Sequence, residues 1–167
     1  MSVRIGIVFP KDYDLKLLEN FKNKYNLSLI EVNNKYVSNQ LHNDEVFLQA
    51  TETGCDSLTG IGAYDLYTKD ISSLCENIEE VSLAQSIIDE FQERKLKYKE
   101  DALRWIEIIN VLKYEYNVGL FGVFWHFCSG TFNEEKIIFS NRLTCKAKNI
   151  TIEYIMKIAE DVIVFFQ

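Results

Sequence analysis

The sequence predicts an α+β domain in which helices pack on a central mixed or antiparallel β-sheet. Segments with the alternating pattern of strands and segments with the i, i+3, i+4 pattern of helices both occur, but they do not alternate regularly as in a doubly wound fold. With 167 residues, 47% of them apolar and 13% aromatic, the chain can bury a substantial core of large side chains. No linker, repeat or low-complexity segment interrupts it, so we expect residues 1–167 to form a single domain.

The N-terminal part shows a strand, a helix and a second strand. Residues 3–9 (VRIGIVF) alternate in apolar character and predict a mostly buried strand, which Pro10 closes because proline cannot donate to a ladder. Apolar residues at helical spacing predict a helix over 13–25, and 27–32 (LSLIEV) predicts the second strand. This order allows a right-handed parallel crossover. Asn33 and Asn34 then mark a turn.

The region 35–68 has the weakest pattern in the chain. Residues 45–52 (EVFLQATE) are consistent with a strand, and 59–67 (TGIGAYDLY) with either a loop or an edge strand that bends at its two glycines. The spacing Ser73-x-x-Glu76 then predicts a capping box before a helix over about 81–93, which has a narrow apolar stripe.

The C-terminal part predicts two helices with two strands between them. Residues 101–116 are apolar around most of a helix circumference, so this helix is expected to be largely buried. Strands are predicted at 118–127 and about 136–146, joined by the hairpin-like loop CSGTFNEE (128–135). Residues 151–166 place apolar side chains on one face and predict an amphipathic C-terminal helix.

The stretch FGVFWHFCSG places His126 two residues before Cys128, the spacing of a candidate Cys/His pair. Alternation puts both side chains on one face of the strand, but Cα atoms two positions apart are separated by about 6.6 Å, too far for a nucleophile–base hydrogen bond. We therefore interpret Cys128 as a small buried hydrophobe and His126 as a core or strand-end imidazole bonded to the backbone. A metal site would require distant ligands such as His42 or Cys55 to converge.

The remaining motifs argue against the common enzyme classes. GIGAYD lacks the third glycine of a dinucleotide fingerprint and carries Asp65 where a pyrophosphate would approach. Walker A, nucleophile-elbow and zinc-protease motifs do not occur. The sequence also shows no signal peptide, no apolar run long enough for a membrane span and no metal-binding cysteine spacing. We therefore expect a cytoplasmic protein with reduced thiols, no cofactor and no metal.

Negative charge is concentrated in one part of the chain. Between Asp44 and Glu93 there are twelve acidic residues and a single base, Lys69, a net charge of −11, whereas the other residues carry 13 acids and 17 bases. Exposed acids also keep small domains soluble, and clustering in sequence need not become clustering in space. If these acids form one surface, it repels nucleic acid and anionic lipid and attracts a cationic protein.

The function that this charge predicts is a binding protein that neutralises a basic protein partner. In size, charge, cytoplasmic character and missing catalytic motifs, the chain resembles the small acidic immunity proteins that bacteria make beside secreted toxins, especially nucleases, whose substrate clefts are basic. The resemblance matches no individual residues. It implies inhibition of a toxin domain by occlusion, with no nucleic acid or membrane as partner. The predicted partner-binding residues are two aromatic anchors and six acids: Tyr64, Asp65, Tyr67, Asp70, Glu76, Asp89, Glu90 and Glu93.

Two other functions stay open on sequence grounds. A small enzyme would place a substrate pocket between the sheet and the 151–166 helix, with His126 as the acid/base group. An adaptor or viral host-interaction protein would bind a partner of unspecified chemistry. Lysine outnumbers arginine 14 to 4, which is typical of an AT-rich genome and fits a bacterial or viral source.

Overall fold

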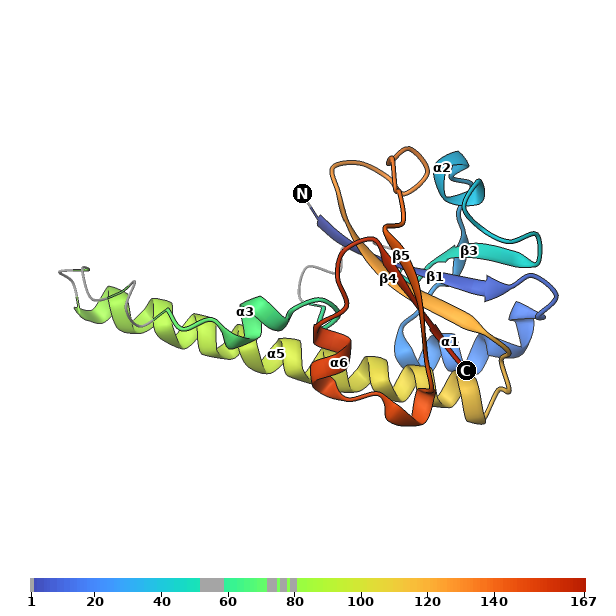
Figure 1. The fold of residues 1–167 in the computed structure, drawn as a ribbon. Helices are drawn as coiled ribbons and strands as arrows, with labels where there is room; N and C mark the ends of the chain where they lie inside the picture. The colour runs from blue at the N-terminus through green and yellow to red at the C-terminus, as the bar shows by residue number, and fades with distance from the viewer. Residues whose placement is uncertain (1, 52–58, 72–74, 76–77, 79–80) are drawn as a thin grey trace.

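In the computed structural model, which describes residues 2–51, 59–71, 75, 78 and 81–167, helices pack against a six-stranded sheet (Figure 1). In chain order the elements are β1 (Ser2–Pro10), a 3-10 helix (Leu15–Leu18), α1 (Glu19–Tyr25), β2 (Ile30–Glu31), α2 (Lys35–Ser38), β3 (Glu45–Gln49), α3 (Tyr64–Thr68), α5 (Val81–Tyr114), β4 (Phe121–Cys128), β5 (Asn141–Cys145), a second 3-10 helix (Ala147–Asn149), α6 (Ile152–Met156) and β6 (Val162–Phe166).

The sheet is mixed, which confirms the predicted α+β class. Its strand order is β2-β3-β1-β4-β6-β5, and all neighbours are antiparallel except β5 and β6. Because β3 is antiparallel to both β1 and β2, the strands β1 and β2 run in the same direction with β3 between them. The predicted parallel connection therefore passes over one intervening strand.

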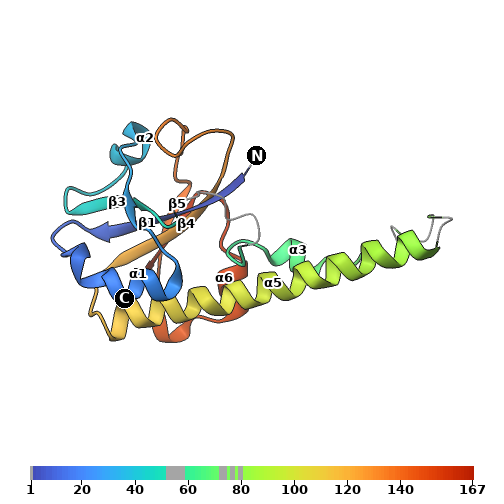
Figure 2. The ribbon, with the colours of Figure 1, turned by 180° about the vertical axis from the view of Figure 1, so that it is seen from behind.

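Both faces of the sheet are covered, as the apolar pattern of β4 predicted. Phe121 and Val123 point into a core with α1, α5 and α6, whereas Phe124 and Cys128 point into a second core with α2 and the 129–140 loop. Figures 1 and 2 show these two groups of elements on opposite sides of the sheet. Strand β4 is thus a central, structural strand.

The two helices predicted at 81–93 and 101–116 are one continuous helix of 34 residues, α5. The joining residues (RKLKYKE) contain neither glycine nor proline and are mostly strong helix formers. Ion pairs from Glu90 to Arg94 (2.6 Å) and from Glu93 to Lys97 (2.7 Å) bridge the junction at i, i+4 spacing. The predicted burial of the C-terminal half is confirmed, since Trp105, Ile108, Ile109 and Leu112 are fully buried.

The amphipathic helix predicted at 151–166 is wrong in its second half. Helix α6 ends at Met156, and residues 162–166 form β6, whose five side chains are all buried. A run of β-branched and aromatic residues buried on both faces suits an interior strand, although its apolar positions also fit a helix. Because β6 lies between β4 and β5, the predicted hairpin through residues 128–135 does not form.

In the region of weak pattern, the strand suggested at 45–52 is present over 45–49, and the segment after Gly62 is neither loop nor edge strand. Residues Tyr64–Thr68 form the short helix α3. The bend predicted at Gly62 is present, with φ of +73°, and an added Cβ would lie 2.3 Å from the Trp125 indole nitrogen. The predicted capping box from Ser73 to Glu76 lies outside the described residues.

Candidate functional site

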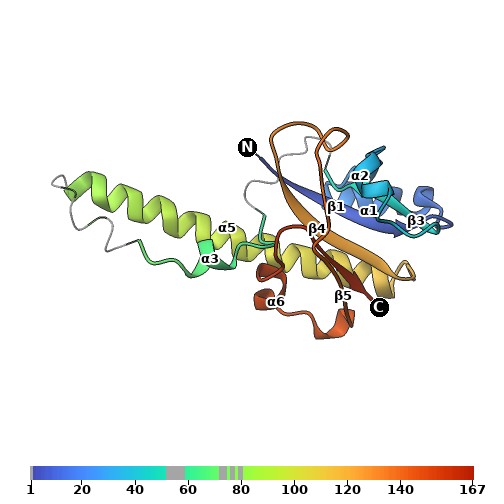
Figure 3. The same cartoon turned by 45° about the horizontal axis from the view of Figure 1, so that its top comes forward.

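The acidic segment forms part of a projection from the body of the protein. Figures 1 and 3 show the N-terminal half of α5 extending beyond the sheet, with α3 beside the same helix. The buried residues of α5 begin only at Tyr98, so none of residues 81–97 is buried. We refer to residues 64–71 and 81–97 together as the arm.

Four of the predicted partner-binding residues lie on or just after α3, where their environments differ. Tyr64 and Tyr67 are half-buried and pack against the main core, and the Lys157 ammonium lies 4.4 Å from the centroid of the Tyr64 ring. Asp65 and Asp70 are exposed. The tyrosines therefore fasten α3 to the body, while the two acids face solvent.

Three further predicted residues lie along the exposed surface of α5. Asp89 accepts a hydrogen bond from Gln85 (2.8 Å), whereas Glu90 and Glu93 form the ion pairs with Arg94 and Lys97 described above. Charge at those two glutamates is therefore partly compensated within the helix. Glu76, the remaining predicted residue, lies outside the described part of the chain.

Exposed apolar side chains accompany these acids on the arm. Val81 is 80% exposed, Leu96 61% and Leu83 50%. A hollow of about 190 Å³ lies where the 64–71 segment meets α5, and it is lined by Ile71, Ile87, Glu90, Phe91 and Arg94. Exposed apolar and charged side chains therefore lie together on the arm.

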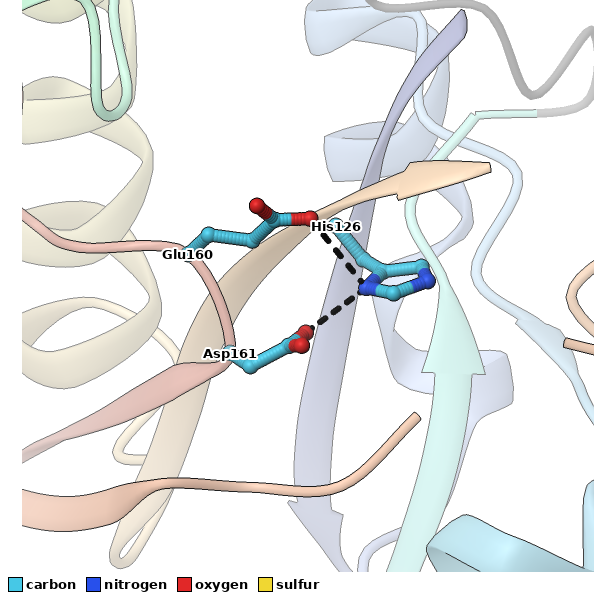
Figure 4. A group of neighbouring side chains, drawn as sticks. All are labelled: His126, Glu160 and Asp161. Carbon is cyan, nitrogen blue, oxygen red and sulfur yellow. Dashed lines mark hydrogen bonds and ion pairs between the residues drawn. The ribbon is translucent and has the colours of Figure 1, made fainter. Parts of the chain in front are cut away.

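A second group of chemistry-bearing side chains surrounds His126 (Figure 4). The imidazole Nδ1 lies 2.7 Å from Asp161 Oδ1 and 3.5 Å from Glu160 Oε1. Sequence reasoning selected His126 and expected a backbone partner, but the partner is a carboxylate. It missed Glu160 and Asp161 because both were assigned to the polar face of the predicted C-terminal helix.

The turn before β6 aims the two carboxylates at His126. Asp161 has a left-handed backbone conformation with φ of +57°, which aspartate tolerates better than most residues. Its N–H donates to the carbonyl of Trp125 (3.1 Å), and its carbonyl accepts from the N–H of Ser140 (2.9 Å). Glu160 Oε1 accepts the N–H of Phe127 at 2.9 Å. Backbone contacts thus fix the turn against the end of β4.

Burial and charge act in opposite directions on His126. Burial lowers its pKa, but the hydrogen bond to Asp161 and the negative charges of Asp161, Glu160 and Glu135 together outweigh that effect, so the pKa is raised above its usual value. Arg4 lies directly opposite His126 on β1, and its guanidinium stacks 5.8 Å from the Phe132 ring centroid. The neighbouring carboxylates together therefore influence the imidazole more strongly than burial does.

Cys128 does not form a catalytic pair with His126. Its side chain is 1% exposed, and burial raises the pKa of its thiol to about 12. A protonated, inaccessible thiol is a poor nucleophile and a poor metal ligand. The interpretation of Cys128 as a small buried hydrophobe is confirmed.

A cavity of about 710 Å³ lies elsewhere, around the C-terminal end of β1 and the start of β4. Its lining includes Lys11, His42, Glu45, Arg142 and Phe165. The Arg142 guanidinium is held by Glu45 (2.5 Å) and lies 4.6 Å from the Phe165 ring centroid. The pocket predicted between the sheet and a 151–166 helix is therefore wrong in its position, since that helix does not form.

No protein-family model, curated protein or solved structure gave a significant match to this chain. Among the helices that the structure describes, none combines the length and the apolar character needed to cross a bilayer.

Proposed function

We propose that this chain is a binding protein whose arm captures a basic protein partner, and that it serves as an immunity protein for a secreted toxin. The observation that carries the proposal is the projecting half of α5, in which no side chain is buried between residues 81 and 97. This helix segment contributes little to the core, so core packing does not explain its exposed apolar side chains. Contact with a partner explains them.

Charge supports a basic partner. The arm up to Glu93 lies within the segment from Asp44 to Glu93, which has a net charge of −11. The arm itself carries five acids and four bases, because Arg94, Lys95 and Lys97 lie at its C-terminal end. Complementary fields accelerate association by about 10- to 1,000-fold and disfavour wrong partners. A nuclease cleft is lined with cations that bind phosphates, and carboxylates on the arm would occupy the positions of those phosphates. Inhibition by occlusion then requires no chemistry from this chain.

The shape of the arm suits insertion into a cleft. At about 1.5 Å per residue, the 81–97 segment is roughly 25 Å long. The exposed side chains of Val81, Leu83 and Leu96 supply apolar contacts, and Asp65 and Asp89 supply charge around them. In this arrangement Tyr64 and Tyr67 hold α3 against the body of the protein and do not contact the partner. Contact with the partner, which the sequence predicted for tyrosines and acids alike, is then made by the exposed acids.

The test measures binding of the purified protein encoded immediately upstream, which is where the proposal places the toxin. The arm variant carries Asp89→Lys, Glu90→Lys and Glu93→Lys. A control variant with the same change in charge carries Asp12→Lys, Glu19→Lys and Glu134→Lys, three exposed acids outside the arm. Circular dichroism and thermal unfolding first establish that both variants keep the fold.

We expect the arm variant to weaken binding by about 100-fold or more and to remove most of its salt dependence, because reversed charges repel the partner. The control is expected to stay within about 3-fold of the wild type, since exposed charges outside an interface mainly affect steering. Equal losses in the two variants, or wild-type affinity in the arm variant at low salt, would contradict the proposal.

A further inference from the structure

We infer that His126, Glu160 and Asp161 form a binding site for a divalent transition-metal ion. Each residue offers one donor atom, and the imidazole nitrogen and two carboxylate oxygens all lie within 4.8 Å of one another. Figure 4 shows both carboxylates directed at the same ring nitrogen. The inference uses none of the residues of the arm and does not depend on the proposed function.

Hydrogen bonding explains only part of this arrangement. A single proton on Nδ1 serves Asp161 at 2.7 Å, whereas Glu160 at 3.5 Å makes no hydrogen bond with the ring. The ring proton is therefore bonded to only one of two neighbouring carboxylates, whose like charges repel at close range. An ion with two positive charges in place of that proton would interact favourably with all three groups.

The distances between the donors suit one ion. Zinc binds imidazole nitrogen at about 2.0–2.1 Å and carboxylate oxygen at about 2.0–2.2 Å, which separates neighbouring ligands by roughly 3.0–3.4 Å in octahedral or tetrahedral geometry. The observed separations of 2.7 Å and 3.5 Å from Nδ1 bracket this range. The two carboxylate oxygens lie within 4.8 Å of each other, so a bound ion would draw them together.

The three ligands are fixed before an ion binds, and the site is open on one side. The imidazole stands on β4, Glu160 is held by the N–H of Phe127, and Asp161 by its backbone bonds on both sides of the turn. The side chains are 10% exposed for His126, 23% for Asp161 and 38% for Glu160. Solvent can therefore reach the carboxylates, and water can fill the remaining coordination positions.

The donor set selects the class of metal. One imidazole and two carboxylates suit Zn²⁺ or Mn²⁺, while Mg²⁺ and Ca²⁺ prefer sites made of oxygen alone. Cys128 lies on the same face of β4, but its side chain is 1% exposed and is packed in the second core. Glu135 adds negative charge near the ring, and Arg4 opposes it from β1. The ion expected here is therefore a transition metal that accepts both nitrogen and oxygen ligands, bound without a thiolate.

The test is calorimetric titration of the full chain with Zn²⁺ alone, after treatment with a chelator and dialysis. The diagnostic variant is Glu160→Gln, because its amide oxygen can still accept the N–H of Phe127 while its charge is lost. The matched control is His42→Asn, which removes the only other histidine in the sequence.

We expect the wild type and His42→Asn to bind one Zn²⁺ per chain with a rise in melting temperature, and Glu160→Gln to bind at least about tenfold more weakly. Mg²⁺ should not compete. No saturable binding by the wild type, unchanged affinity in Glu160→Gln, a loss confined to His42→Asn, or equal competition by Mg²⁺ would each overturn the inference.

Discussion

Leu96 and Leu112 allow the arm to be compared with the buried half of the same helix. Leu112 is fully buried, whereas Leu96 is 61% exposed. Replacing a buried leucine by alanine costs about 2.7–5.0 kcal/mol, from lost transfer free energy and the remaining cavity. Only 39% of Leu96 is covered, so Leu96→Ala should cost less than about 1 kcal/mol, and the higher helix propensity of alanine offsets part of that.

The assay is equilibrium unfolding in urea, followed by circular dichroism, for the wild type and for Leu96→Ala and Leu112→Ala. We expect Leu112→Ala to lower the free energy of unfolding at least about threefold more than Leu96→Ala, with similar slopes against urea. Equal destabilisation would show that the 81–97 segment packs against the body in solution. The description of this segment as an available arm would then be wrong.

Three other predictions concern the body of the protein. Asn34 is fully buried and its side chain makes four hydrogen bonds, two of them as the N-cap of α2. Asn34→Ala should therefore lower the free energy of unfolding by about 2–4 kcal/mol, and a loss below about 1 kcal/mol would argue against the capping role. With divalent ions chelated, the raised pKa of His126 adds stability that is complete below the pKa of an unfolded histidine, about 6.5, and is lost as the pH rises through the higher folded value. The free energy of unfolding should therefore fall as the pH rises above about 6.5 in the wild type but not in Asp161→Asn, and parallel profiles would refute the pairing. At Gly6 an added Cβ would lie 2.3 Å from the Phe124 ring, so Gly6→Ala should cost about 1–3 kcal/mol in thermal unfolding, whereas a stabilised variant would disprove the close contact.

Local patterns predicted those elements whose environment repeats along the sequence. Residues 3–9 alternate in apolar character because Ile5, Ile7 and Phe9 of β1 all point into the main core. The apolar character of both faces of 121–128 correctly indicated a central strand. The 101–114 part of α5 was equally clear, since its apolar residues cover most of the helix. In these segments local propensity and tertiary burial favour the same structure.

The errors occurred where long-range pairing or helix propensity decided the structure. The run VIVFF fits a buried helix or a buried strand, and only its position between β4 and β5 makes it β6. The apolar patterns at 81–93 and 101–116 suggested two helices, because burial begins only at Tyr98 while the backbone is helical through residues that favour helix on both sides of it.

Long-range pairing and helix continuity also explain which features of the candidate sites the sequence did not predict. His126 was recognised as a residue to test, but its carboxylate partners lie more than 30 residues later and reach it only through the turn before β6. The useful signal was the pair Glu160 and Asp161 placed directly before a buried strand. The acidic segment from Asp44 to Glu93 was found by counting charge, whereas the projection of α5 and its internal ion pairs required coordinates.

Hydrogen–deuterium exchange tests the central claim most directly, with the chain alone and in the presence of the purified protein encoded upstream. We expect slower exchange of backbone amides within residues 81–97 when the partner is present, because the hydrogen bonds of a bound helix open less often. Unchanged exchange there, with protection appearing instead around the cavity near Arg142 or the turn at Asp161, would contradict binding by the arm.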